Sequence, residues 1–167
     1  MDNEDKKWEN CEKFYDLVWI EHQFIQFVKI EDKFELRINQ EGIQSLTQNL
    51  AKLSRNWKNR IAYLDGINLG GEFLVEDPLC YLDGGIRVIF MRLYGTEEIL
   101  RATYAEMTPS CYSEIYFEGT KKGLEKLIKV LNDTKNEPQQ MEIESADANG
   151  LPFHFRTFLV NKKGRRL

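Results

Sequence analysis

Residues 35–53 read ELRINQEGIQSLTQNLAKL, and a change of pattern inside this stretch decides the fold class. Its first residues alternate apolar and charged side chains, as a half-buried strand does. Apolar residues then recur at intervals of three and four, which is the spacing of one face of an α-helix: Ile43, Leu46, Leu50, Leu53 and Trp57. A strand that leads into a one-sided helix predicts a sheet with helices packed against it.

Residues 114–131, EIYFEGTKKGLEKLIKVL, follow the same plan. An alternating strand leads through a loop to Gly123, as the first strand leads to Gly42. A second apolar stripe follows, formed by Leu124, Leu127, Ile128 and Leu131. Two short strands are expected after each helix. The chain therefore contains either two strand–helix–strand–strand units in one sheet or two stretches that are alike by chance.

Turn signals and alternation predict the remaining strands. They are a hairpin over 24–38, short pieces at 60–64 and 72–75, strands at 86–94 and 98–107, and a closing hairpin of 141–144 with 153–160. The stretch 98–107 could also be a short helix, and 17–23 could belong to a helix or to the first strand. The prediction is an α+β fold: a mostly antiparallel sheet with two amphipathic helices on one face.

Length and composition predict a single cytoplasmic domain over residues 1–167. We expect a helix within 1–16 and a basic, frayed tail at 161–167. The acidic N-terminus lacks the pattern of a signal peptide, and no apolar run approaches the ~20 residues of a membrane span. An odd number of cysteines, Cys11, Cys80 and Cys111, argues against a disulfide framework and favours thiols in a reducing compartment.

Residues that could carry catalysis are sparse. The chain lacks the HExxH, CxxC, GxSxG and P-loop motifs. Its two histidines, His22 and His154, stand far apart, and alternation with Phe153 and Phe155 predicts that His154 faces solvent. We therefore expect no enzyme activity, no metal and no cofactor. A net charge of −4 and the lack of a shared basic stripe argue against nucleic-acid binding.

Acidic residues gather in two stretches that contain no lysine or arginine. The residues that we expect to bind a partner are Asp65, Glu72, Glu76, Asp77 and Asp83 in the first stretch and Glu142, Glu144 and Asp147 in the second. If these stretches form one negative face, that face would attract a basic protein. The aromatic residues Tyr63, Phe73 and Tyr81 could supply the apolar centre of the interface. The alternative is that acidic loops only keep the protein soluble.

Residues 114–131 resemble a strand–Gly–Leu–helix element of bacterial polymorphic-toxin immunity proteins, the contact-dependent growth inhibition type. The resemblance covers this segment alone. It implies a cytoplasmic antitoxin that binds a basic toxin domain, often a nuclease, and blocks its active site or substrate path. The segment carries no functional residue of that family over to this chain.

Two other classes of function stay open at this point. One is a small-molecule-binding or regulatory domain, with its ligand between sheet and helices. The other is an enzyme whose site joins a histidine to carboxylates with perturbed pKa values.

Overall fold

The structure is a computed structural model that describes residues 18, 20–30, 33–55, 60–64, 86–107, 112–147, 150–161 and 163–167. At 60–64, 86–87, 106–107 and 112–114 only the backbone is described. The helix expected within 1–16, the strand expected at 72–75 and all three cysteines lie outside these ranges.

Ten elements are described, in this order: β1 (Ile25–Ile30), β2 (Lys33–Ile38), α2 (Gln40–Ser54), β3 (Arg60–Leu64), β4 (Ile86–Arg92), β5 (Leu100–Met107), β6 (Tyr112–Gly119), α3 (Lys121–Asp133), β7 (Gln139–Ser145) and β8 (Phe153–Leu159). The α+β prediction is confirmed, and 98–107 contains a strand. The stripe of α2 is buried through Leu53, while Trp57 lies outside the described residues.

The expectation of a mostly antiparallel sheet is wrong, because the sheet is mixed. Its strand order is β1-β2-β8-β7-β5-β6-β4-β3. Antiparallel pairs join consecutive strands, β1 with β2, β3 with β4, β5 with β6 and β7 with β8. Parallel pairs join β2 with β8 and β4 with β6 across the two halves of the chain, and β5 with β7 within the second half. In each half a helix joins the first pair of strands to the second, and the strand before the helix pairs with a strand of the other half.

The same pairing plan therefore occurs in both halves. Each half is a pair of strands, a helix and a second pair of strands. The strand before the helix pairs in parallel with the last strand of the other half: β2 with β8, and β6 with β4. The predicted repeat is present at the level of topology, and it is longer by one strand at its start.

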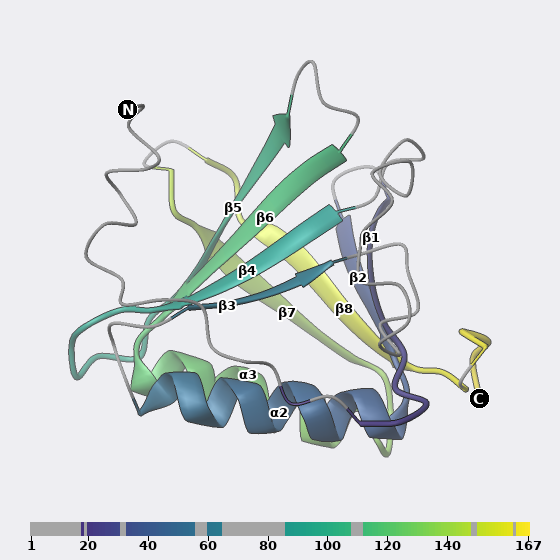
Figure 1. Ribbon diagram of the computed structural model, residues 1–167. Coiled ribbons are helices and arrows are strands. Elements are labelled where there is room, and N and C mark those ends of the chain that lie inside the picture. The colour runs from purple at the N-terminus through teal and green to yellow at the C-terminus, as the bar shows by residue number, and fades with distance from the viewer. Residues whose placement is uncertain are drawn as a thin grey trace.

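The sheet curls, and the two helices lie side by side across one end of it (Figure 1). Their buried leucines join the inward side chains of the strands in one core. Three fully buried phenylalanines from different strands meet there, Phe27, Phe90 and Phe117. The rings of Phe90 and Phe117 stack with 5.1 Å between centroids. Burying each side chain of this size contributes about 1.5–3 kcal/mol, so the shared core fixes the helices on the sheet.

The structure answers the question that the sequence left open for residues 17–23, in the part described, and differs from the expectation for the C-terminal tail. Residues 20–23 form a turn, closed by a bond from Gln23 N to Ile20 O of 3.0 Å, with His22 at a φ of 66°. The tail that we expect to be frayed folds back: Val160 and Arg166 form an antiparallel bridge. Within the described residues, no helix has the length and apolar character needed to cross a membrane.

Candidate functional site

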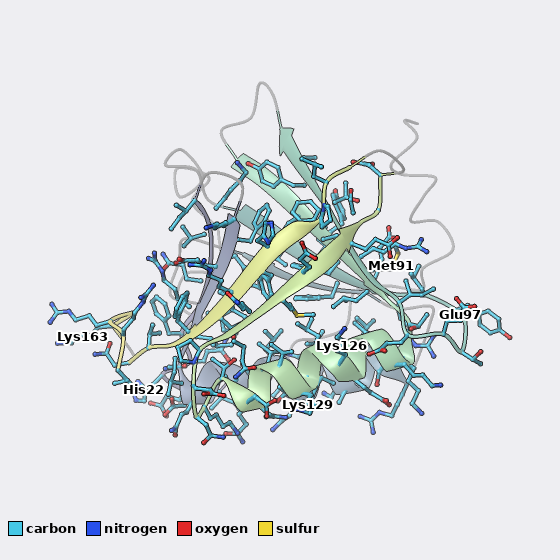
Figure 2. All side chains as sticks on the ribbon, turned by 180° about the vertical axis from the view of Figure 1, so that it is seen from behind. His22, Met91, Glu97, Lys126, Lys129 and Lys163 are labelled. Carbon is cyan, nitrogen blue, oxygen red and sulfur yellow. The ribbon has the colours of Figure 1, made fainter. Side chains whose placement is uncertain are left out.

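The outer face of β2, β8 and β7 carries a group of exposed polar side chains. The sequence analysis singled out some of them, Glu142, Glu144 and His154. Figure 2 shows this side of the sheet, with β7 and β8 nearest the viewer and the helices below. Alternation in β8 buries Phe155 and Thr157 and turns His154 and Arg156 outward. The prediction that His154 faces solvent is confirmed, since 52% of its side chain is exposed.

A row of polar side chains crosses the three strands. Lys33 of β2 pairs in register with His154 of β8, which pairs in turn with Glu142 of β7. Partners in register point to the same face of a sheet, so a cation, an imidazole and a carboxylate lie in sequence across the strands. His154 Nδ1 lies 3.9 Å from Glu142 Oε1.

The next row is built around a nearly buried carboxylate, that of Glu35. Its Oε2 accepts a hydrogen bond from Arg37 Nη2 at 3.2 Å, and its Oε1 lies 3.9 Å from Arg166 Nη2 in the tail. The Arg166 guanidinium also sits over the ring of Phe158, 3.9 Å from its centroid. Glu35 is therefore compensated by two arginines, and the tail covers the outer face beside β8.

A depression of about 570 Å³ lies on the outer face above these rows. The residues that line it are Lys33, Gln140, Met141, Glu142, His154, Phe155 and Arg156. A volume of this order is within the range of small-ligand sites, but the lining is more polar than in most of them.

Three of the predicted acidic residues are described, and they lie along one line on β7 and just after it. Glu142 and Glu144 alternate outward on the strand, and Asp147 follows in a bend; all three are exposed. We call Glu142, Glu144 and Asp147 the acidic strip. In the part of the chain described, the carboxylates of Glu144 and Asp147 make no hydrogen bond or ion pair.

Cations flank the acidic strip on both sides. Arg101 of β5 pairs in register with Glu144, and a smaller depression of about 280 Å³ is lined by both residues and by Asp147. The Nε of Arg101 is buried and has no hydrogen-bond partner. On the other side stand His154 and Arg156 of β8. The described part of the predicted negative face is thus one strand wide.

The other predicted partner-binding residues are not placed. Asp65, Glu72, Glu76, Asp77, Asp83, Phe73 and Tyr81 lie outside the described residues. Tyr63 is described only in its backbone, opposite Val88. Whether the first acidic stretch joins the acidic strip therefore stays a prediction.

Sequence reasoning missed the cations Lys33, Arg101 and Arg156 as site residues. Alternation within β2, β5 and β8 does place them on one side of each strand. Arg156 comes beside β7 through the hairpin of β7 and β8, which the sequence predicts. Lys33 and Arg101 reach the site only through the parallel pairs of β2 with β8 and of β5 with β7, which leave no local signal in the sequence.

Among the described residues, no group of three or more His, Cys, Asp and Glu side chains could bind a metal ion. His22 lies in the turn before β1, beside Glu21, and His154 lies in β8.

The chain matches no protein-family model, and comparison with curated proteins and with solved structures finds no significant match. Its function therefore has to be argued from its own residues.

Proposed function

We propose that this protein is an immunity-type inhibitor that binds a bacterial toxin domain, possessing a basic contact surface, and neutralises it. The observation that carries the proposal is the acidic strip, whose exposed carboxylates stand on a sheet face that the two helices leave uncovered. The resemblance of residues 114–131 to an element of immunity proteins supports the same class.

Free carboxylates on an uncovered face favour a basic partner. Since Glu144 and Asp147 have no internal partner among the described residues, docking a cation there breaks no existing ion pair. Complementary charge raises the rate of association and fixes the orientation of the partner more than it raises affinity. An inhibitor that must capture a toxin quickly benefits from this property.

The flanking cations restrict the shape of the partner. Arg101 and Arg156 stand on the strands beside the acidic strip and would repel a broad basic surface. The partner that fits best is a narrow basic segment, such as a strand or loop with lysines or arginines along one edge.

The test is a charge reversal of the acidic strip, Glu142→Lys with Glu144→Lys and Asp147→Lys. A tagged wild-type chain is used to capture partners from the source cells, and the captured toxin domain is then co-expressed with each variant. We expect the wild type to relieve toxicity and the triple variant to lose both capture and protection.

A matched control reverses Glu97, Glu98 and Glu125, which are exposed carboxylates outside the acidic strip. It should protect like the wild type. Equal protection by the acidic-strip variant would contradict the proposed surface. A parallel set, Glu72→Lys with Glu76→Lys and Asp77→Lys, tests the first acidic stretch separately.

A further inference from the structure

We propose that the depression on the outer face of β2, β8 and β7 is a binding site for a small molecule that carries a phosphate or carboxylate group. Lys33 of β2 and Arg156 of β8 would hold that group, and His154 of β8 stands between Lys33 and Glu142 in their row across the strands. The cations of this site lie outside the acidic strip and the two surfaces share Glu142, so substitutions of Lys33 and Arg156 test ligand binding without removing a carboxylate of the strip.

Arg156 is left without a partner by the arrangement around Glu35. The two residues are partners in register on adjacent parallel strands, so a pair between them would be the simplest outcome. The carboxylate of Glu35 is instead bonded by Arg37 on its own strand and approached by Arg166 from the tail. The guanidinium of Arg156 makes no hydrogen bond or ion pair in the described part of the chain, and Arg156 lines the depression.

Lys33 is a second uncompensated cation at the same place. The acid nearest to its row, Glu142, stands beyond His154, and its Oε1 faces the imidazole at 3.9 Å. Lys33 is exposed and, within the described ranges, also has no ion-pair partner. The strand spacing and the rise along a strand put the Cα atoms of Lys33 and Arg156 about 8 Å apart, and a single oxyanion can lie between two long side chains at that separation.

The donors in the depression suit an oxyanion. A guanidinium presents paired N–H groups that match two oxygens of a phosphate or carboxylate, and an ammonium adds a point charge. Gln140 and Glu142 line the β7 side, where they can accept hydrogen bonds from hydroxyl or amino groups of the same ligand. The geometry therefore favours a ligand that is anionic at one end and a hydrogen-bond donor at the other.

The probes are inorganic phosphate and citrate, titrated into the full chain at constant ionic strength and followed by amide NMR shifts. We expect saturable binding with shifts centred on Lys33, Gln140, His154 and Arg156. Lys33→Ala and Arg156→Ala should each weaken binding by about tenfold or more, the effect of losing one charge-assisted hydrogen bond. Phosphate binding without citrate binding would identify a phosphate site, and the reverse a carboxylate site.

Lys122→Ala with Lys126→Ala is the matched control, because both lysines are exposed on α3 and neither lines the depression. It should bind like the wild type. Arg156 is only partly exposed, so Arg156→Lys, which keeps the charge and loses the paired donors, serves as a second variant if alanine impairs folding. Linear, non-saturating shifts spread over the lysines of α3 would overturn the proposal. Saturable binding of a short polyglutamate peptide with no binding of phosphate or citrate would also overturn it, in favour of a protein contact.

Discussion

Asn39 and Thr120 make equivalent hydrogen bonds in the two halves of the chain. Each caps its helix by accepting from the backbone N–H of a glycine three residues on, Gly42 at 2.8 Å and Gly123 at 3.2 Å. Each side-chain oxygen also accepts from the residue just before the first strand of its half, Phe24 N at 2.8 Å and Ile99 N at 3.1 Å. One buried polar side chain in each half thus ties a helix start to a strand start, and the topological repeat extends to atomic detail.

Replacing these caps should destabilise the fold by more than an ordinary helix cap does. Loss of an N-cap costs about 1 kcal/mol, and Asn39→Ala would also leave Phe24 N and His22 O without their bonds. We expect the free energy of unfolding to fall by about 2–3 kcal/mol for Asn39→Ala and for Thr120→Ala, because each substitution leaves backbone groups without hydrogen-bond partners. Urea unfolding measures this loss.

Two conservative variants sharpen the test of the caps. Asn39→Asp keeps the oxygen that accepts from Gly42 and Phe24 and loses only the donor to His22 O, so it should cost less than alanine. Thr120→Ser keeps the hydroxyl and should be nearly neutral. Alanine and serine variants of equal stability at position 120 would show that the hydroxyl bonds contribute nothing.

Gly123 is required by space. A Cβ there would lie 1.8 Å from Ile99 O, and one at Gly42 would lie 2.5 Å from Phe24 O. Backbone atoms cannot move aside as a flexible side chain can, and overpacking costs about 1–3 kcal/mol or more. We expect Gly123→Ala to be more destabilising than Gly42→Ala in thermal unfolding. Lys122→Ala, at the exposed neighbouring position, should leave the melting temperature unchanged within a degree or two.

Local patterns in the sequence predict most elements but not how the two halves combine. The stripe through Leu46 and Leu50 and the alternation around Leu36 are set by residues a few positions apart, and both structures are found as predicted. Parallel pairs such as Lys33 with His154 join residues more than a hundred positions apart. Periodicity within a strand carries no information about such a partner, so the mixed sheet was missed.

The candidate site shows the same limit. The charge pattern along the chain predicted Glu142, Glu144 and Asp147 as partner-binding residues. The structure shows that they are exposed along one line. Of the cations beside this line, Arg156 is placed by the predicted hairpin of β7 and β8, whereas Arg101 is placed by the parallel pair of β5 with β7, which was not predicted. A charge pattern along the chain is therefore informative about one strand and uninformative about its neighbours.

The C-terminal tail should be held mainly by one side chain. Arg166 lies over Phe158 and near Glu35, whereas Arg165 is exposed and contributes only backbone bonds with Asn161. Arg166→Gln should lose about 0.5–1 kcal/mol, the range of a cation–π contact at a partly exposed site. Arg165→Gln removes the same charge and should lose nothing measurable in urea unfolding. If both variants lost the same free energy of unfolding, the loss would come from the change in net charge and not from the contact of Arg166 with Phe158.

Thr134 and Thr157 form a buried pair of hydrogen-bonded hydroxyls. Which of the two hydroxyls donates decides which valine variant loses more stability. Their Oγ1 atoms lie 2.6 Å apart, and the Thr134 hydroxyl also donates to Val130 O at 2.8 Å, so Thr157 must donate to Thr134. Thr157→Val removes that donor and leaves Thr134 bonded to Val130, which should cost less than about 1 kcal/mol. Thr134→Val leaves the buried Thr157 hydroxyl without its acceptor and should cost about 1–3 kcal/mol. Because the double valine variant strands no hydroxyl, its loss in urea unfolding should be smaller than the sum of the single losses. A larger loss for Thr157→Val than for Thr134→Val would mean that the hydroxyls bond in the opposite direction.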